Sequence, residues 1–426
     1  MLYRLVRPLA ALGIRANYQH ICISNTDRIP KDKPVILAAN HPTAFMEPCI
    51  LACFLDRPLF FLVRGDFFQK PIFNFLLRQL NMLPVFRMRD GGYKNLKQNY
   101  STFEACYQAL KQNKTIMILA EGRTIHEKRL RSIQKGTARI ALGTMERFPD
   151  LEEVYVVPVG VNYTYAERSR TRVMIDFGEP LKAASYLKEE AKYDAEGITQ
   201  LTEDLSTALK RRVVIIEEPA DEPLTEDLLR LQRPLYTLPT FPVINDSVEP
   251  LMAEKAMADQ VNETPSTEKS IWKEKLATFF QELGQHQISE KDLLGPQFSR
   301  YSALVYLLFG FIPFVIGYLW NLVPLGLASY IADNKVKDIT FYTPVKWAVG
   351  IGAFLLWTIA GIIILSTLSM YWAIPLLFLF MLFGYHATYY LEIVKRFVQA
   401  GTWQGLSREL QFELKAKANS LLLGKW

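Results

Sequence analysis

Between Pro34 and Ile216 the chain alternates short apolar runs with segments of helical periodicity. The apolar runs have the length of strands and lie at 35–40, 59–64, 82–86, 115–121, 154–163 and 172–178. Between them, segments such as 103–110 and 136–148 repeat apolar residues at the spacing of one helix face. Near-continuous apolar strands separated by helices are typical of a sheet with helices on both faces. The pattern therefore predicts an α/β domain over residues 31–216, with its ligands at the carboxyl ends of the strands.

Residues 1–30 precede this domain and open with a different pattern. From Leu2 to Arg15, large apolar residues recur at helical spacing and are interrupted by arginines. One interpretation is a helix in the membrane interface, with the arginines at the level of the lipid head groups. The other is an ordinary helix that packs on the domain and breaks near Pro8. The arginines also interrupt the apolar core that a secretory signal needs, so we reject a signal peptide.

Residues 217–300 predict a linker followed by a helical arm. Prolines recur among acidic residues between 217 and 250, which is typical of a linker or of an extended arm that lies on the domain. A helix is then predicted from Thr264-Pro265 to Leu283-Gly284, because proline is favoured at helix starts and glycine at helix ends. The apolar face of this helix must pack against another surface; it consists of Ile271, Leu276, Phe279, Phe280 and Leu283.

Two long uncharged stretches, Ser302 to Ala332 and Trp347 to Leu391, predict a helical membrane domain over residues 301–395. About 20 apolar residues make one spanning helix, so the second stretch predicts two spans joined by a turn near 366–372. Lysines and arginines flank this stretch on both sides, which favours the cytoplasm for both flanks. The first stretch is either one tilted span or a tight hairpin. A cytoplasmic catalytic domain requires it to enter and return, so we expect four membrane-embedded segments and a basic cytoplasmic tail at 396–426.

Composition and charge narrow the possible functions less than the hydrophobic pattern does. Half of the residues are hydrophobic, 22% are charged, and the formal charge of +6 is modest for 426 residues. Such a charge suits anionic lipid head groups or phosphorylated substrates, yet many soluble proteins carry it as well. The four cysteines form no C-x-x-C pair, and no metal-type spacing with histidine is present; they are Cys22, Cys49, Cys53 and Cys106. They indicate reduced thiols, and hence a cytoplasmic first half of the chain.

Candidate chemistry begins at Asn40-His41-Pro42, where the run 35–40 ends. A carboxylate, Glu47, follows at the start of the next predicted helix. A neutral imidazole can take a proton from an alcohol, and a carboxylate on its other nitrogen fixes the tautomer and stabilises the imidazolium. Positions 41 and 47 do not share a helix face, so the pair meets only if the loop folds His41 back over the helix start. Taken alone, this motif is equally compatible with a solvated loop histidine.

Further polar or turn-forming residues lie at or near the ends of three other apolar runs. Arg87 follows the run 82–86, Glu121-Gly122-Arg123 closes the run 115–121, and Pro158 lies in a later strand. An arginine side chain matches phosphate oxygens with two hydrogen bonds, and glycine lets backbone N–H groups approach an anion. The basic residues between 128 and 139 either steer an anion towards these positions or form a solvated charged face.

In this order and spacing, the four blocks resemble the phospholipid/glycerol acyltransferase family over about residues 30–215. That family's blocks are histidine, four residues and aspartate; a strand that ends in arginine; F-P-E-G with small polar residues; and a strand centred on proline. The combination is specific, whereas each block alone is not. The resemblance implies a mixed, largely parallel sheet flanked by helices, followed here by the C-terminal membrane domain.

Two positions depart from the family pattern. Met46 stands where most members have aspartate, so the acid comes one position later, as Glu47, and is one methylene longer. This spacing, and the run 134–142 after the third block, resemble the branch of fungal-type glycerol-3-phosphate acyltransferases. Ala120 replaces the proline that usually precedes E-G, a minor loss of turn rigidity. The implied role of Glu47 is therefore less secure than that of His41.

Carried over residue by residue, the resemblance implies that His41 is the general base on the acceptor hydroxyl and that Glu47 orients it. Arg87 would bind the acceptor phosphate. Further residues of that subsite would be Glu121, Gly122 and Arg123, and Pro158 would shape the wall on the acyl side. Attack on a thioester creates an oxyanion that needs N–H donors, for which the 41–44 loop and the segment 84–86 are candidates. No G-x-S-x-G motif is present in the sequence, so direct transfer without an acyl-enzyme is the simpler mechanism.

The implied function is an O-acyltransferase of phosphatidate synthesis in the cytoplasmic membrane. Acyl-CoA or acyl-carrier-protein would be the donor, and glycerol-3-phosphate or 1-acylglycerol-3-phosphate the acceptor; the spacing of His41 and Glu47 favours glycerol-3-phosphate. We expect membrane lipids as partners, no cofactor, no metal and no nucleic acid, and the sequence leaves the oligomeric state open. One alternative is a lipid-binding or scaffold protein on an inactive acyltransferase fold, motivated by Met46. Another is an acyltransferase for a lipid acceptor without phosphate.

Overall fold

The structure is a computed structural model, and it describes residues 2–85, 94–188 and 194–424. It divides into two compact units. The first unit comprises Met1–Ile215 together with two short later segments, Thr240–Val248 and Lys337–Pro344. The second comprises Ile216–Pro239, Glu249–Val336 and Val345–Trp426. Two segments from the second half of the sequence are thus part of the first unit.

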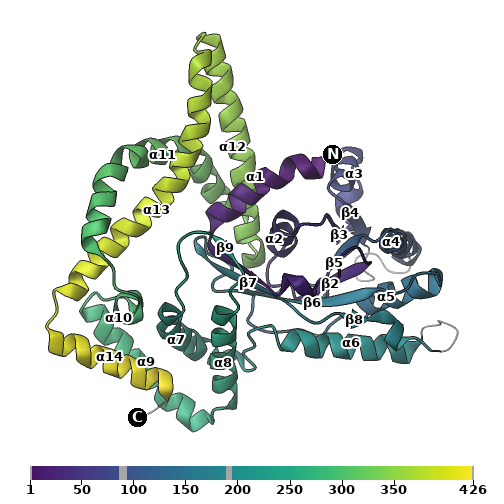
Figure 1. Ribbon diagram of the computed structural model, residues 1–426, viewed down its shortest axis with the longest axis horizontal. Coiled ribbons are helices and arrows are strands. Elements are labelled where there is room, and N and C mark those ends of the chain that lie inside the picture. Colours follow the sequence, from purple (N-terminus) through teal and green to yellow (C-terminus); the bar gives the residue numbers. More distant parts are fainter. Residues whose placement is uncertain (1, 86–93, 189–193, 425–426) are drawn as a thin grey trace. The chain divides into compact units, whose positions relative to one another are not determined.

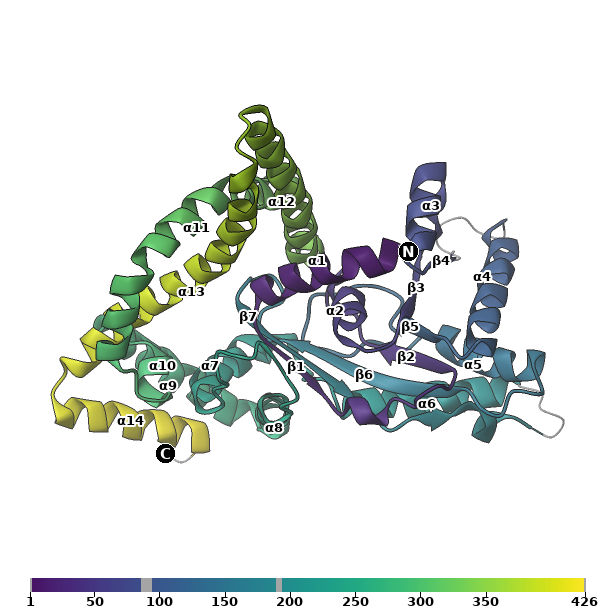
Figure 2. The same ribbon diagram turned by 45° about the horizontal axis from the view of Figure 1, so that its top comes forward.

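The first unit is built on a mixed, largely parallel sheet (Figures 1 and 2). The strands run in the order β4-β3-β5-β2-β6-β7-β1-β9, and β8 pairs with β6. Only the β6–β7 and β6–β8 pairs are antiparallel among the strands described. The bounds are β1 Tyr18–Ser24, β2 Val35–Ala39, β3 Leu59–Arg64, β4 Met82–Val85, β5 Thr115–Leu119, β6 Tyr155–Tyr163, β7 Thr171–Phe177, β8 Leu181–Lys182 and β9 Ile244–Asn245. The predicted α/β class is confirmed, and all six predicted strands are present.

Sequence analysis did not predict the strands β1 and β9. β1 mixes polar and apolar residues, with Gln19 and His20 among them, so it lacks the continuous apolar run of the central strands. β9 is formed by the proline-rich segment for which we expected a linker or an extended arm, and it pairs in parallel with Ile21 and Cys22 of β1. A strand of two residues has no periodicity of its own, so only its pairing partner identifies it.

Helices cover both faces of this sheet. On one face lie α4 (Lys94–Lys111), α5 (Gly136–Arg147) and α6 (Ala195–Lys210), whose buried residues form one core with alternate residues of β2 and β5. On the other face lie α1 (Leu2–Asn17) and α2 (Met46–Phe54), as Figure 2 shows. Burial of both faces explains why the central strands are apolar throughout.

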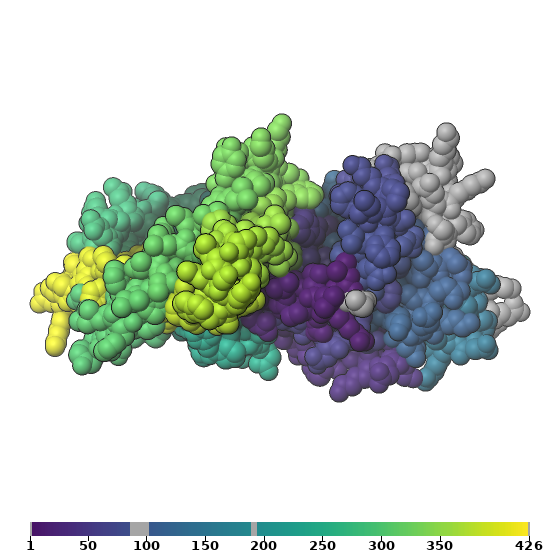
Figure 3. Space-filling model, turned by 90° about the horizontal axis from the view of Figure 1, so that it is seen from above, coloured from purple at the N-terminus to yellow at the C-terminus, as the bar shows by residue number. Residues whose placement is uncertain are grey.

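Helix α1 packs on the domain, as one of the two interpretations expected, but it continues through Pro8 without a break; its position in a membrane interface stays a prediction. Its small residues Ala10 and Ala11 are buried, and the Arg7 side chain donates to the carbonyl of Leu55 at 2.6 Å, so the helix packs on the domain. Its large residues on the opposite side are exposed to solvent: Leu5, Val6, Leu9 and Leu12. Helix α3 (Pro71–Gln79) also exposes large apolar residues, namely Ile72, Phe73, Phe75 and Leu76. Figure 3 shows both helices on one face of the first unit.

In the second unit, short helices pack around a core of their own. They are α7 (Glu222–Gln232), α8 (Glu249–Glu263), α9 (Ser266–Gln285), α10 (Glu290–Leu294) and α14 (Arg408–Leu423). In place of a linker, residues 217–250 thus contain α7 and the start of α8. Helix α9 was predicted, and three of its predicted face residues are buried: Leu276, Phe279 and Leu283. Its Trp272 is buried as well, whereas Ile271 is exposed.

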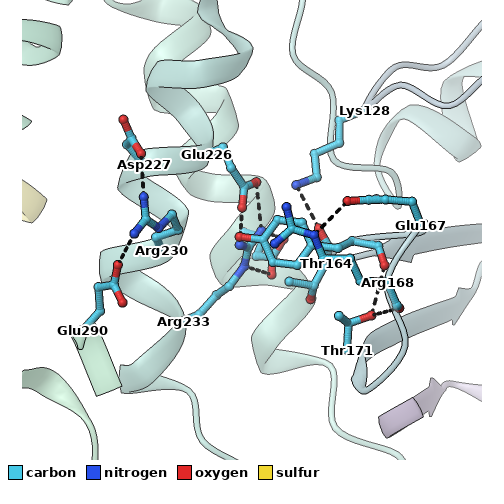
Figure 4. Close-up of polar contacts among 12 residues, drawn as sticks. Lys128, Thr164, Glu167, Arg168, Thr171, Glu226, Asp227, Arg230, Arg233 and Glu290 are labelled. Atoms are coloured by element: carbon cyan, nitrogen blue, oxygen red, sulfur yellow. Dashed lines mark hydrogen bonds and ion pairs between the residues drawn. The ribbon is translucent and has the colours of Figure 1, made fainter. Parts of the chain in front are cut away.

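Ion pairs hold this helical core at its polar edges (Figure 4). Arg233 bonds to Glu226, and its Nε lies 2.9 Å from a carboxylate oxygen of Glu254 in α8. Arg230 lies between Asp227 and Glu290, which links α7 to α10. The Arg233 and Glu254 side chains are largely buried, so removing one partner would leave a buried unpaired charge.

Three helices of the described chain are long and apolar enough to cross a membrane. They are α11 (Arg300–Lys335), α12 (Tyr342–Thr367) and α13 (Ile374–Gln404). The second uncharged stretch forms α12 and α13 with a short turn between them, as predicted. The expectation of four separate segments is wrong, because the first stretch is a single helix that contains Pro313 and Pro324 without ending at either. Proline kinks a helix that neighbouring helices support, and Figure 1 shows that α11 is bent.

Candidate functional site

The site forms where two neighbouring parallel strands end. β2 and β5 pair in register from Val35 with Thr115 to Ala39 with Leu119, so the residues that follow both strands emerge side by side. The backbone N–H of Ala120 extends this ladder by donating to the carbonyl of Ala39 at 2.8 Å. His41 comes two residues after β2, and Glu121 comes two residues after β5. The predicted position of the site, at the carboxyl ends of the strands, is thus where the structure brings these residues together.

Asn40 anchors the start of this loop to the neighbouring strand β6. Its side-chain N–H donates to the carbonyl of Val161 at 2.8 Å, and its side-chain oxygen accepts from the N–H of Val161 at 2.7 Å. The amide thus replaces one rung of the β2–β6 ladder after β2 has ended. Sequence analysis did not identify this role, because position 161 is far away in the chain and shows no polar signal.

The loop from His41 to Phe45 folds back over the start of α2, as the pairing of His41 with Glu47 requires. The Glu47 side chain is fully buried; one carboxylate oxygen accepts from the N–H of Thr43 at 2.6 Å. The other oxygen lies 3.8 Å from Nδ1 of His41, longer than a hydrogen bond but within the range of an ion pair. Neither of these two atoms has a hydrogen-bond partner among the residues described. The structure thus brings the two side chains together; their catalytic roles remain a prediction.

Met46 has a different environment from its neighbour. It is the first residue of α2, and its side chain is fully buried in the apolar core. An acid at position 46 would therefore place its carboxylate among apolar side chains instead of beside His41. The shift of the acid to position 47 is consistent with the way this loop enters α2.

The segment after β5, from Glu121 to Ile125, holds the backbone of His41 through hydrogen bonds. Glu121 is buried, and its two carboxylate oxygens accept from the N–H groups of His41 and Arg131, each at 2.8 Å. The N–H of Ile125 donates to the His41 carbonyl at 3.3 Å. Burial raises the pKa of Glu121 above its usual value, and the two N–H donors act against this shift because they stabilise the carboxylate. Glu121 thus supports the loop, and its predicted part in phosphate binding is at most indirect, since a carboxylate repels an anion.

Gly122 makes the turn between these contacts possible. Its φ is +68°, a left-handed conformation that side chains other than glycine rarely adopt. A Cβ at this position would also lie 2.9 Å from Cγ of Gln134. The glycine of the third block is therefore required by the backbone, independently of any ligand.

The ring of His41 makes one hydrogen bond within the described structure. Its Nε2 lies 2.8 Å from Oγ1 of Thr124, on the side of the ring opposite to Glu47. The ring is almost fully buried, whereas Thr124 is half-buried. Nε2 therefore faces the more open side of the site, which is the geometry that a general base needs. Sequence analysis did not identify Thr124 as a contact of His41.

The N–H groups of the 41–44 loop are largely engaged within the protein. His41 and Thr43 donate to Glu121 and Glu47, and the N–H of Ala44 donates to the carbonyl of Thr340 at 3.0 Å. Thr340 lies in the segment 337–344, which follows α11 in the sequence and belongs to the same unit as His41. These three groups are thus not available to an oxyanion in this arrangement. Since Pro42 has no N–H, none of the four residues 41–44 offers a free backbone donor in this arrangement.

Two buried tyrosines, Tyr18 and Tyr163, lie near the carboxylate of Glu47. Tyr163 at the end of β6 is buried, with its ring 6.1 Å from that of Tyr18. Burial raises the pKa of Tyr163 well above its usual value, and the nearby carboxylate of Glu47 adds to this shift. The phenol therefore stays neutral at all physiological pH values and forms part of the environment of the Glu47 charge. Sequence analysis missed both residues, since buried tyrosines in strands carry no distinguishing pattern.

The remaining predicted residues lie in different surroundings. Arg87 falls outside the described residues, so its phosphate-binding role remains a prediction. Arg123 is exposed. Pro158 is buried in β6, where it lies beside Ala38 of β2, and its role in shaping the wall on the acyl side remains a prediction. Of the basic residues after the third block, Lys128 lies 3.5 Å from the carbonyl of Thr164, as Figure 4 shows. Over the ranges described, no group of three or more metal-binding side chains is found.

Comparison with known proteins defines the class first. Residues 20–162 match the family model described as Acyltransferase. Two proteins of Saccharomyces cerevisiae are similar to part of the chain. Glycerol-3-phosphate O-acyltransferase 1 is 30% identical over 113 residues, 25% of this chain and 14% of the relative. Glycerol-3-phosphate O-acyltransferase 2 is 30% identical over 89 residues, 21% of this chain and 12% of the relative. Residues 20–162 are thus similar to the Acyltransferase family, and the chain shares short regions of similarity with glycerol-3-phosphate acyltransferases.

The extent of these similarities is limited. The matched regions cover about a seventh or less of the two yeast relatives. A solved structure, that of the 1-acyl-sn-glycerophosphate (LPA) acyltransferase PlsC from Thermotoga maritima, has a TM-score of 0.36 and 20% sequence identity. It covers 48% of this chain and 78% of that chain.

The different surroundings of positions 46 and 47 lead to a prediction. Glu47→Gln keeps the size of the side chain and an acceptor for Thr43 but removes the charge beside Nδ1 of His41. We expect kcat to fall by roughly 10²-fold or more, because nothing then stabilises the imidazolium. The exchange Met46→Asp with Glu47→Met should be inactive and less stable, since it buries an unpaired carboxylate.

Acyl transfer and the midpoint of thermal unfolding in detergent would be measured for both variants. The single variant should unfold near the wild-type temperature, whereas the exchange should unfold well below it. Wild-type kcat in Glu47→Gln, or full activity in the exchange, would show that the charge at position 47 is not needed.

Proposed function

We propose that this protein is a membrane-bound O-acyltransferase that moves a fatty acyl group from a thioester donor to a hydroxyl of a glycerol-phosphate acceptor. Nε2 of His41 takes the proton of the hydroxyl while its oxygen attacks the thioester carbonyl carbon. The carbon–sulfur bond then breaks, and the leaving thiolate receives the proton from the imidazolium. Acyl-CoA and acyl-carrier-protein both carry such a thioester, and no cofactor takes part in this scheme.

One arrangement carries the proposal. The His41 ring stands at the carboxyl end of β2, with Nδ1 towards the buried Glu47 carboxylate and Nε2 towards the half-buried Thr124. A carboxylate on one nitrogen and an accessible second nitrogen are the requirements for a histidine general base. The same arrangement argues against an inactive scaffold, because it retains an acid beside the histidine despite Met46.

For the acceptor we favour glycerol-3-phosphate. Both yeast relatives are named for this acceptor, and the Acyltransferase family match over residues 20–162 includes the loop with His41 and Glu47. The acceptor phosphate would be bound by Arg87 and by the basic residues that follow the third block, since guanidinium groups bind phosphate bidentately. Arg123 is exposed near the site and is a further candidate for this contact.

Removal of the proposed base tests whether the protein is an enzyme. With acyl-CoA and glycerol-3-phosphate, wild type should release free thiol, and His41→Ala should release it about 10²–10⁴-fold more slowly. Thiol release is measured directly with a chromogenic disulfide. His126→Ala serves as the matched control, because this histidine pairs with Glu167 outside the proposed site and its loss should leave the rate unchanged. Thiol release from neither wild type nor variant, with any acceptor, would support the scaffold alternative.

A competition between acceptors tests the substrate. Offered both acceptors with one labelled donor, the protein should acylate glycerol-3-phosphate at least as well as 1-acylglycerol-3-phosphate. Arg87→Ala should raise the KM for the acceptor by an order of magnitude or more, because a charge-assisted pair to phosphate is lost. Turnover of the lysolipid alone would refute the preference for glycerol-3-phosphate. An unchanged KM in Arg87→Ala would favour an acceptor without phosphate.

We also propose how the chain enters the membrane. The segments 240–248 and 337–344 belong to the catalytic unit, and no candidate span lies between 249 and 299. Both ends of α11 are therefore on the catalytic side. Helix α14 shares a core with α7, α8 and α9, so α13 also ends on this side. A hairpin of α12 and α13 that crosses and returns satisfies these conditions, whereas a single crossing by α11 does not.

Contacts within the second unit support this course of α11. Arg300 lies over the ring of Phe397 near the end of α13, and Asn321 donates to the carbonyl of Phe380 at 3.2 Å. The first part of α11 therefore runs alongside α13 into the membrane. Its last part follows α12 back, since a Cβ on Gly350 would lie 3.8 Å from Cβ of Ala328. Helix α11 enters and returns as one bent helix, with the catalytic unit in the cytoplasm as the flanking basic residues predict.

Cysteine labelling tests this topology. In a variant without the four native cysteines, single cysteines would replace Gln297 before α11, Asn334 at its end and Ser369 in the α12–α13 turn. A membrane-impermeant maleimide should label positions 297 and 334 from the same side and position 369 from the other. Labelling of 297 and 334 from opposite sides would establish that α11 spans. A position 369 that reacts from neither side would mean that the hairpin ends inside the bilayer.

A further inference from the structure

The hydroxyl of Thr124 occupies the place where a substrate hydroxyl has to arrive. Its Oγ1 lies 2.8 Å from Nε2 of His41. A general base must come within about 2.6–3.2 Å of the oxygen whose proton it removes. The lone pair of Nε2 lies in the ring plane and accepts one well-aligned hydrogen bond. Thr124 and an acceptor hydroxyl therefore cannot both use it at the same time.

The surrounding loop holds Thr124 in this position. Glu121 fixes the His41 N–H from one side of the loop, and the N–H of Ile125 contacts the His41 carbonyl. Thr124 stands between these two residues, so its side chain is directed at the ring by contacts on either side. The left-handed turn at Gly122 sets the direction in which this loop leaves β5. The backbone of this loop therefore places the Thr124 hydroxyl beside Nε2.

The same contact decides which nitrogen of His41 carries the proton. Nδ1 faces the Glu47 carboxylate, which favours a proton on Nδ1. The threonine hydroxyl then donates to the bare Nε2. In the absence of substrate, this is the only hydrogen bond of the ring among the residues described. The ring is buried and its Nδ1 lies 3.8 Å from the Glu47 carboxylate, so the hydrogen bond from Thr124 adds to the packing that fixes the orientation of the ring.

We propose that Thr124 is a positioning residue that holds Nε2 as the proton acceptor and is displaced by the acceptor hydroxyl on binding. This inference rests on the proposed role of His41 as the base. Displacement breaks one hydrogen bond, so the threonine weakens acceptor binding while it keeps the ring oriented for catalysis. The Thr124 hydroxyl leaves Nε2 when the acceptor hydroxyl arrives, and the incoming hydroxyl then donates its proton directly to Nε2.

Substitution of Thr124 should separate binding from catalysis. Thr124→Val keeps the shape and removes the hydroxyl. We expect the KM and the directly measured Kd for glycerol-3-phosphate to fall by about three- to tenfold, the effect of one hydrogen bond that no longer has to be broken. We expect kcat to fall as well, by about tenfold, because the ring is less well oriented. Thr124→Ser retains the hydroxyl and should restore both values to near wild type.

Thr144→Val is the matched control. It removes a buried threonine hydroxyl that bonds to the carbonyl of Ile140 within α5, away from the site. It should leave the KM and the Kd unchanged, so it reports the effect of losing a hydroxyl as such. The Kd is measured calorimetrically without acyl donor, which makes it independent of activity.

Three outcomes would overturn the proposal. A KM and Kd that stay constant or rise in Thr124→Val would show that no contact is displaced. A kcat as low as that of His41→Ala, with unchanged KM, would instead identify Thr124 as a proton relay between substrate and His41. Equal losses in the serine and valine variants would indicate a structural role only. If His41→Ala itself kept wild-type thiol release, the proposed function would fail, whatever the Thr124 variants show.

Discussion

The loop after β2 buries its backbone polar groups, and the architecture of the site follows from how the protein satisfies them. A buried N–H or carbonyl without a partner costs about 1–3 kcal/mol, so each such group needs an acceptor or a donor. Asn40 supplies both for Val161, Glu121 accepts from His41, and Glu47 accepts from Thr43. The polar residues that resemble catalytic motifs in the sequence therefore first hold the backbone in place. His41 is presented to the open side of the site as a result.

The two buried acids of the site, Glu47 and Glu121, both bond to the backbone of the loop after β2. Each carboxylate oxygen of Glu121 accepts one backbone N–H, from His41 and from Arg131, so this side chain joins the segments that follow β2 and β5. Glu47 uses one oxygen for the backbone and directs the other at His41, so one residue both shapes the loop and provides the charge beside the ring. Moving the acid by one position relative to the family pattern is tolerated because the loop, and not the helix face, sets the distance. The site depends on the loop backbone more than on the spacing of its residues.

The catalytic unit is completed by segments from beyond the acyltransferase domain. β9 adds a strand beside β1, and the segment 337–344 provides the carbonyl that binds the N–H of Ala44. The second of these segments directly follows α11 and directly precedes the body of α12. The connection between α11 and α12 therefore contributes a hydrogen-bond acceptor to the loop of His41 within the first unit.

The sequence alone determined the strands at the centre of the sheet, the helices between them and the apolar helices of the membrane part, because each has a local periodicity that burial imposes. It also indicated His41, Glu47 and the third block as neighbours at strand ends. Only the tertiary structure decided the contacts between distant positions: Asn40 with Val161, Thr124 with His41, β9 with β1, and Ala44 with Thr340. Such contacts depend on strand order and loop direction, which leave no periodic signal in the chain. The tertiary structure likewise decided the surroundings of Met46 and Glu47. These residues are adjacent in the sequence, yet one faces the core and the other faces the histidine.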